Sequence, residues 1–142
     1  MKPDTQKAIS LLREGCYTCV VCRDDLCYTA CVRGVRPLLN WLDNGTSLQD
    51  FCAADKVVGR AAAFLYCLLG VSEVYAQVMS RPAADVLCSY GISVHADTLT
   101  DGIINRAGTG PCPFEAAVMD IRDPIEALTA IRDTRKRLQE GS

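Results

Sequence analysis

The chain has 142 residues, of which 49% are hydrophobic and 23% charged, so residues 1–142 have the composition of one globular domain. This composition excludes a disordered chain, a collagen-like repeat and a coiled coil. The 15 Lys and Arg side chains against 17 Asp and Glu give a net charge of −2, which shows no signature of binding to nucleic acid or to an acidic membrane. With no apolar leader and no bilayer-length apolar run in the sequence, we expect a cytoplasmic protein.

Apolar periodicity, helix caps and turn residues divide the chain into one series of helices and strands. In chain order we predict a helix from residue 4 or 5 to 15, strands at 17–22 and 26–33, helices at 38–44 and 55–69, a strand at 74–79, a helix at 80–91, a strand at 92–96, a loop at 97–112, and helices at 113–119 and from 124 onward. This order predicts a three-layer α/β/α domain with a central mixed sheet, an antiparallel hairpin first and helical crossovers after it.

Asp55 and Lys56 form the first candidate site, because they precede a stripe of small residues at the start of the predicted helix 55–69. At a helix N-terminus, Asp55 would complement the helix dipole, and free N–H groups would favour an anionic ligand. The alternative is an aspartate that only caps its helix. We interpret the small residues themselves as tight packing against the sheet.

Ser80 and Arg81 form the second candidate, where a buried strand runs directly into a helix N-terminus. α/β proteins usually place ligands at such junctions. Arg81 is suited to pair with a carboxylate or phosphate there. The alternative is an ordinary serine cap with Arg81 in solvent.

A segment that ends at Glu115 carries the densest group of reactive and polar residues. Its glycines allow the backbone to approach a ligand closely, and Asn105, Arg106 and Thr109 supply polar groups. Cys112 precedes a proline and is therefore predicted at a helix N-terminus, where thiols ionise more easily. Glu115 is placed to cap that same helix from its first turn. The alternative is a structured turn with an inert, buried cysteine.

Nine cysteines without a secretion signal favour free thiols over a disulfide framework. Cys16, Cys19 and Cys22 have the spacing of metal ligands, but the period of two in a strand would turn Cys19 away from the other two. We interpret these thiols as small hydrophobic side chains and keep a Cys-based redox or metal-handling protein as an alternative. The single histidine, His95, has no partner motif and is interpreted as structural.

Four parts of the sequence, at 34–38, at 54–63, around Ser80 and at 105–115, together resemble DUF1893, a bacterial and archaeal family of uncharacterised proteins. The resemblance implies a cytidine-deaminase-like fold. That superfamily holds zinc through a His-x-Glu and a Pro-Cys-x-x-Cys motif at two successive helix N-termini. Neither motif occurs in this chain, and the resemblance puts Asp55-Lys56 and Ser80-Arg81 at the matching places. We therefore expect neither zinc-dependent deamination nor another cofactor.

Together these features indicate a cytoplasmic small-molecule-binding domain for a nucleotide-like or other anionic ligand. Whether it is also a zinc-independent enzyme is left open, with Asp55, Lys56 and Cys112 as the catalytic candidates. The candidate ligand-binding residues are Ser80, Arg81, Asn105, Arg106, Thr109 and Glu115. A non-catalytic regulatory or protein-interaction domain is the main alternative. Apolar helix surface suggests a homodimer, and we expect neither nucleic acid nor membrane as a partner.

Overall fold

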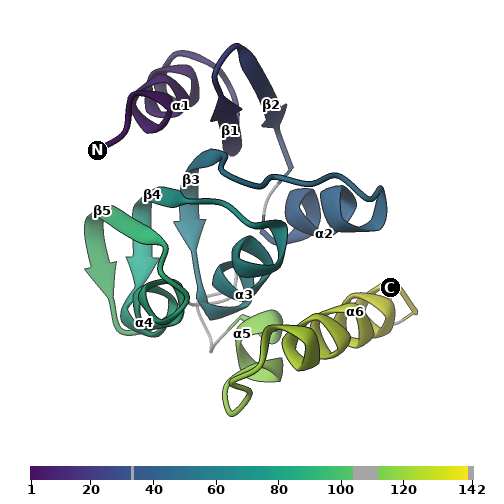
Figure 1. Cartoon of the computed structure of the whole chain (residues 1–142). Coiled ribbons are helices and arrows are strands. Elements are labelled where there is room, and N and C mark those ends of the chain that lie inside the picture. The colour runs from purple at the N-terminus through teal and green to yellow at the C-terminus, as the bar shows by residue number, and fades with distance from the viewer. Residues whose placement is uncertain (33, 104–111, 141–142) are drawn as a thin grey trace.

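The computed structural model describes residues 1–32, 34–103 and 112–140, which form a five-stranded mixed sheet and six helices (Figure 1). The elements in chain order are α1 (Pro3–Glu14), β1 (Cys19–Arg23), β2 (Leu26–Ala30), α2 (Arg36–Asp43), β3 (Cys52–Val58), α3 (Arg60–Leu69), β4 (Glu73–Ser80), α4 (Arg81–Ser89), β5 (Ser93–Thr100), α5 (Pro113–Ala117) and α6 (Pro124–Glu140). Within these ranges no helix has the length and apolar character needed to cross a membrane.

The sheet has the strand order β2-β1-β3-β4-β5. β1 is antiparallel to both β2 and β3, whereas β3, β4 and β5 are parallel to one another. The turn between β1 and β2 consists of Asp24 and Asp25, and Asp24 adopts a left-handed φ of 53°, which aspartate tolerates better than most residues. α3 and α4 are the crossovers between the parallel strands. The predicted α/β class, its antiparallel hairpin and its helical crossovers are thus confirmed.

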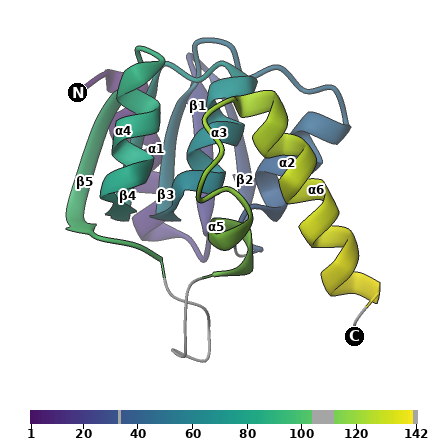
Figure 2. The ribbon, with the colours of Figure 1, turned by 90° about the horizontal axis from the view of Figure 1, so that it is seen from below.

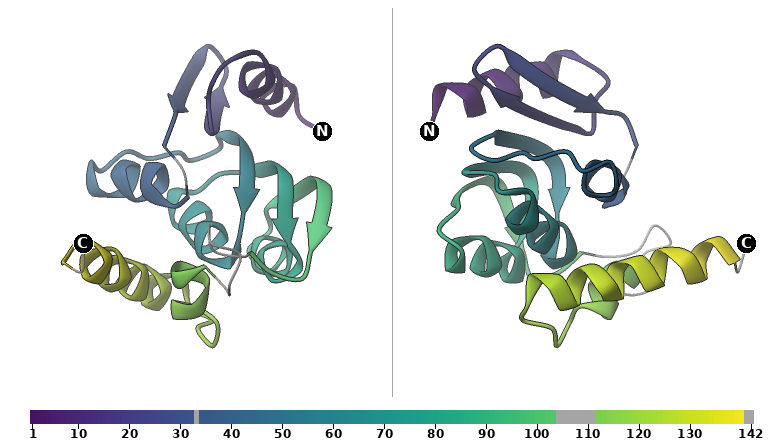
Figure 3. Two further views of the ribbon diagram at one scale, coloured as in Figure 1. Left: turned by 180° about the vertical axis from the view of Figure 1, so that it is seen from behind. Right: turned by 45° about the vertical axis from the view of Figure 1, so that its right-hand side comes forward.

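Helices cover both faces of this sheet. Val21, Ala53 and Val74 belong to the larger core, which also contains the buried residues of α2, α3 and α4. The alternate strand residues Val20 and Tyr75 point the other way, into a smaller core beneath α1. Figure 2 shows α1 behind the sheet and α2, α3 and α4 in front of it. α6 packs on α3 and lies on the side of the molecule away from α1 (Figure 3).

α3 is the central helix of the larger core. Its residues from Ala61 to Tyr66 are all buried, because the helix contacts α2, α4, α5, α6 and β3. A helix that is apolar on all sides needs such complete cover. Gly70 ends the helix in the left-handed conformation, with a φ of 86°. The small residues at the start of α3 therefore serve close packing, as their spacing predicted.

β3 is the main difference between the sequence prediction and the structure. The prediction placed the start of a helix at Asp55, but that residue lies inside β3 and α3 begins only at Arg60, after Gly59. Alanine, aspartate and lysine have weak strand propensity, so the local sequence favours a helix there. Pairing with β1 on one side and β4 on the other overrides that preference. In addition, β5 continues to Thr100 through residues predicted as loop.

Candidate functional site

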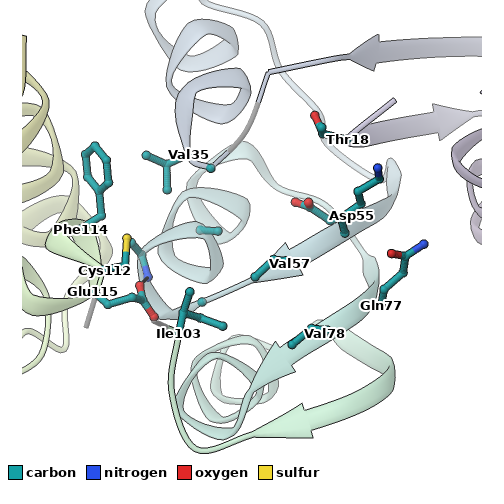
Figure 4. Close-up of a pocket in the computed structure, with 15 residues that line it drawn as sticks. Thr18, Val35, Asp55, Val57, Gln77, Val78, Ile103, Cys112, Phe114 and Glu115 are labelled. Carbon is teal, nitrogen blue, oxygen red and sulfur yellow. Dashed lines mark hydrogen bonds between the residues drawn. The ribbon is translucent and has the colours of Figure 1, made fainter. Parts of the chain in front are cut away.

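A cavity of about 390 Å³ lies beside the second half of β3. Separate parts of the chain line it, namely the residue before β1, the turn before α2, the strands β3 and β4, the start of α3, and α5 with the residue that precedes it. Figure 4 shows the Asp55 carboxylate pointing from β3 toward the side of the cavity that holds Val35 and Cys112. Of the candidates from the sequence, the cavity brings together Asp55, Lys56, Cys112 and Glu115. We call it the β3 pocket.

Asp55 occupies a special position in the sheet. Its Cα partners are Cys19 of β1 and Ala76 of β4, and Cys19 is the first residue of β1. Beyond Asp55, β3 therefore has β4 as a neighbour but no longer β1, and the β3 pocket lies where this pairing stops. The sequence prediction of Asp55 and Lys56 at a helix N-terminus is wrong, since both are strand residues.

The Asp55 carboxyl is held in a buried cluster with Tyr66 and Cys19. The Tyr66 hydroxyl donates a hydrogen bond of 2.6 Å to Oδ2 of Asp55, and the Cys19 Sγ lies 3.2 Å from the same hydroxyl. Asp55 is only 8% exposed although it lines the cavity. Tyr66 and Cys19 were missed as site residues, because each reads from sequence as one more apolar position in a helix or a strand. The only local signal is that Tyr66 is a polar-tipped side chain within an otherwise apolar helix.

Burial sets the charge of this cluster. Burial raises the pKa of Asp55 to about 7, although hydrogen bonds from the Tyr66 hydroxyl and from the backbone N–H groups of Val57 and Lys56 act in the opposite direction. Burial, together with the nearby Asp55 charge, also raises the pKa of Tyr66 and that of Cys19 well above their ordinary values. Asp55 is thus the member of the cluster that gains and loses its proton near neutral pH.

Lys56 is exposed on β3 and lines the same cavity. Its backbone N–H donates to the carbonyl of Thr18, over 3.1 Å, so the chain before β1 remains attached to β3 at this point. Gln77 of β4 also lines the cavity, and no sequence signal identified it. The rest of the lining is mostly apolar, with Val35, Val57, Val78, Ile103 and Phe114 among its members.

The sequence predicted that Glu115 caps its own helix, α5. In the structure it caps α3 instead. Its two carboxylate oxygens accept hydrogen bonds from the backbone N–H groups of Arg60, at 2.6 Å, and Ala61, at 2.7 Å. A Cβ at position 59 would come within 2.3 Å of the Glu115 Oε1, so any larger residue there would displace the Glu115 carboxylate. The Arg60 side chain in turn donates to the carbonyls of Val118 and Ile121. These contacts attach the α5 region to the start of α3.

Cys112 is the N-cap residue of α5, as predicted. It is half-buried, lines the β3 pocket, and its backbone N–H donates to the carbonyl of Ile103 at 3.0 Å. This hydrogen bond and the Glu115 contacts fix the Cys112 end of α5 at the cavity.

Comparison with known proteins now identifies the fold. The family described as "Domain of unknown function (DUF1893)" matches residues 7–134. The chain belongs to the DUF1893 family. A crystal structure of a DUF1893 family protein from Thermotoga maritima is similar, with a TM-score of 0.85 and 21% sequence identity over 94% of this chain and 91% of that one. No curated protein matched the chain. The resemblance noted in the sequence is confirmed for the family, whose function is unknown.

Two further candidate residues of this DUF1893 protein, Ser80 and Arg81, lie away from the cavity. The Ser80 hydroxyl accepts a hydrogen bond of 3.1 Å from the backbone N–H of Ala83 and so caps α4. The Arg81 side chain is 59% exposed, and its guanidinium pairs with Asp101 at 2.9 Å. Neither residue lines the β3 pocket. Asn105, Arg106 and Thr109 lie outside the described residues.

Cys19 and Cys22 follow the predicted alternation of a strand, whereas Cys16 precedes β1 and is not part of it. Cys19 faces the larger core and Cys22 the smaller one beneath α1, while Cys16 is exposed before the strand begins. Residues 1–32, 34–103 and 112–140 contain no group of three or more His, Cys, Asp or Glu side chains placed to hold a metal ion.

Proposed function

We propose that the chain binds a small organic molecule in the β3 pocket, and that the Asp55 carboxyl exchanges a proton or a hydrogen bond with it. The observation that carries this proposal is a cavity that gathers a buried acid, a lysine and a thiol from separate elements. Small-molecule sites are typically mostly apolar cavities with a few convergent polar groups. A perturbed carboxyl within such a cavity supports the assignment.

Asp55 suits acid–base chemistry because its pKa of about 7 leaves both protonation states populated near neutral pH. The Tyr66 hydroxyl fixes one carboxylate oxygen over 2.6 Å, so the carboxyl has a defined orientation toward the cavity. An enzyme on this site would use Asp55 to hold a water or to move a proton. Cys112 is the nucleophile candidate, and its placement on the wall of the same cavity supports that role.

The proposed ligand has an anionic group and an apolar or aromatic body, as a nucleotide-like molecule does. The Lys56 ammonium is suited to the anionic group, since Lys56 is an exposed cation on the cavity lining. Val35, Val57, Val78 and Phe114 offer apolar contacts to the body. Asp55 is suited to a hydroxyl, an amide or a ring nitrogen, because a carboxyl that titrates near neutrality can donate or accept a hydrogen bond.

We further propose that the fold is of the cytidine-deaminase type. Support comes from two successive parallel strands, β3 and β4, each followed at once by a helix. The residues at these helix starts do not fit zinc, however. They are Gly59-Arg60 and Ser80-Arg81, which supply no thiolate or imidazole ligand, and Glu115 already occupies the first two N–H groups of α3. The proposed chemistry therefore runs through Asp55 and not through a metal.

Native mass spectrometry of protein purified without added ligand or chelator is the first test. We expect the purified protein to retain a ligand with a mass of a few hundred daltons. If it is purified without a ligand, we expect ligand-observed NMR to show binding of at least one compound from a panel of nucleosides, nucleotides and sugar phosphates. Lys56→Met should weaken this binding at least about tenfold, which corresponds to about 1.4 kcal/mol, and Asp55→Asn should remove the dependence of the binding on pH near the Asp55 pKa of about 7.

Lys136→Met is the matched control, because Lys136 is exposed on α6 and does not line the β3 pocket. Its affinity should equal that of the wild type. Wild-type affinity in Lys56→Met, together with wild-type pH dependence in Asp55→Asn, would place the ligand elsewhere and refute the proposed site. No binding to any panel member, with a stable protein partner in its place, would favour the interaction-domain alternative.

A further inference from the structure

The β1–β2 hairpin brings two thiols into direct contact. Cys22 and Cys27 are Cα partners on the two strands, and their Sγ atoms lie 2.7 Å apart. Residues directly opposite each other in an antiparallel pair have Cα atoms about 4.5–5.5 Å apart. Disulfides span Cα separations of about 4.4–6.8 Å. The register of the hairpin therefore suits a disulfide between these residues, and their two sulfur atoms are already in contact.

We propose that Cys22 and Cys27 are a reversible redox site, in which a peroxide converts the two thiols into a cross-strand disulfide. Both residues are free cysteines in this structure. Neither lines the β3 pocket, so this proposal is independent of the proposed ligand site. The hairpin is also attached to α1, since the Lys7 Nζ donates to the Asp24 carbonyl and the Asp24 N–H to Asp4.

The environment gives the two thiols different roles. Cys27 is half-buried on the edge strand β2 and is therefore the more accessible of the two thiols to a small oxidant. Cys22 is fully buried beneath α1. Burial and the adjacent Cys27 thiol raise the pKa of Cys22 to about 12, so it keeps its proton. Cys27 is thus the thiol that reacts first, and Cys22 is the one that completes the bond.

The reaction balances with hydrogen peroxide as the oxidant. The Cys27 thiolate attacks one peroxide oxygen, the O–O bond breaks, and a sulfenic acid and hydroxide form. The Cys22 sulfur then attacks the Cys27 sulfur, so the S–S bond forms as the S–O bond breaks, and the Cys22 proton leaves with the hydroxyl as water. In total two thiols lose two electrons and two protons, and one peroxide becomes two waters. A dithiol reductant reverses the change.

Cys52 is the competing partner for Cys22. It is the Cα partner of Cys22 on the other side, so Cys27, Cys22 and Cys52 form a row across β2, β1 and β3. The Cys52 Sγ lies instead 3.7 Å from the Ser72 Oγ. The short sulfur–sulfur contact therefore favours Cys27 over Cys52 as the partner of Cys22. Peptide mapping can distinguish a Cys22–Cys27 disulfide from a Cys22–Cys52 disulfide.

The test is peptide mapping of fully reduced wild-type protein after treatment with one equivalent of hydrogen peroxide. Remaining thiols are alkylated under denaturing conditions, and trypsin then cuts after Arg13, Arg23 and Arg33. We expect peptides 14–23 and 24–33 to appear as a linked pair, with fragmentation placing the bond between Cys22 and Cys27. Dithiothreitol should release both peptides.

Cys27→Ser should abolish this linked pair, whereas Cys31→Ser, a matched change of an exposed cysteine directly after β2, should retain it. A bond between Cys22 and Cys52 would overturn the proposal. So would unlinked Cys22 and Cys27 under conditions in which the exposed Cys88 is oxidised. Because the decisive measurement uses the wild-type chain, poor folding of a variant leaves the result intact.

Discussion

Replacing Asp55 by asparagine should change how stability depends on pH. In the folded protein, burial raises the pKa of Asp55 from 3.8 to about 7. In the unfolded chain the carboxyl titrates near its ordinary value. Folding therefore favours the protonated form, and the contribution of Asp55 to stability is fully present below about pH 3.8. It is lost as the pH rises to about 7, where the folded carboxyl also ionises.

The size of this effect follows from the shift. About three pKa units at 1.36 kcal/mol per unit give about 4 kcal/mol between the two limits. Of this, about 2–3 kcal/mol falls between pH 5 and pH 8, a range in which unfolding is convenient to measure. Asparagine does not titrate, and its side-chain oxygen still accepts a hydrogen bond from Tyr66. Relative to wild type, Asp55→Asn should therefore become more stable as the pH rises.

Urea unfolding at several pH values, followed by the fluorescence of Trp41, measures this difference. Trp41 is the single tryptophan of the chain, and reductant should be present throughout because of the nine cysteines. Asp101→Asn is the matched control, since the Asp101 side chain is 97% exposed. A difference between Asp55→Asn and wild type that stays constant within about 0.5 kcal/mol from pH 5 to pH 8 would refute a carboxyl with a raised pKa.

Further predictions concern the contacts that attach α5 and α6 to the core. Glu115→Gln should lower the free energy of unfolding by about 1–3 kcal/mol, because a charged cap of two N–H groups is lost; Glu126→Gln, on the exposed start of α6, should cost much less. Gly59→Ala should lower the free energy of unfolding by about the same amount as Glu115→Gln, because its Cβ would displace the Glu115 carboxylate. In a Glu115→Ala background the same substitution should lower the free energy of unfolding clearly less. Asp43→Asn should cost at most about 1 kcal/mol, because the pairs of Asp43 with two arginines of α6 are partly exposed. High salt should remove that cost, and urea unfolding measures all of these effects.

The parts of the fold that sequence predicted correctly depend on local signals. The β1–β2 hairpin is set by two β-prone runs around an Asp24-Asp25 turn, and α4 is set by the Ser80 cap and the proline after it. In each case the residues that decide the structure lie within a few positions of one another. Such signals can be recognised in the sequence without knowledge of the rest of the fold.

β3 shows why the remainder could not be predicted. Its alanines, aspartate and lysine favour a helix locally, and only partners far away in sequence make it a strand, namely β1 and β4. Asp55 was therefore selected for a wrong structural reason. Its actual environment depends on Tyr66 in the following helix and on Cys19 in β1, and no spacing in the sequence reveals that contact.

Glu115 illustrates the same limit for the candidate site. Its local position suggests a cap for α5, but its carboxylate accepts from Arg60 and Ala61, 55 and 54 positions earlier in the chain. Gly59 is the only sign of this contact in the sequence, and a glycine at this position can equally be explained as a small residue needed for close packing. The contact changes the interpretation of the site, because the first two N–H groups of α3 are already satisfied.

An anionic ligand in the β3 pocket would therefore depend on Lys56 more than on a helix N-terminus. Asp55 precedes Lys56 in β3, so its charge opposes the binding of an anion. Protonation of Asp55 as the pH falls below about 7 removes that charge. Anion affinity should then rise from pH 8 to pH 6, by at most about tenfold per pH unit, since one proton is linked to binding. Titration calorimetry of wild type and Asp55→Asn with the same ligand separates this effect from titration of the ligand itself. If the two proteins show the same pH dependence, Asp55 does not face the bound anion.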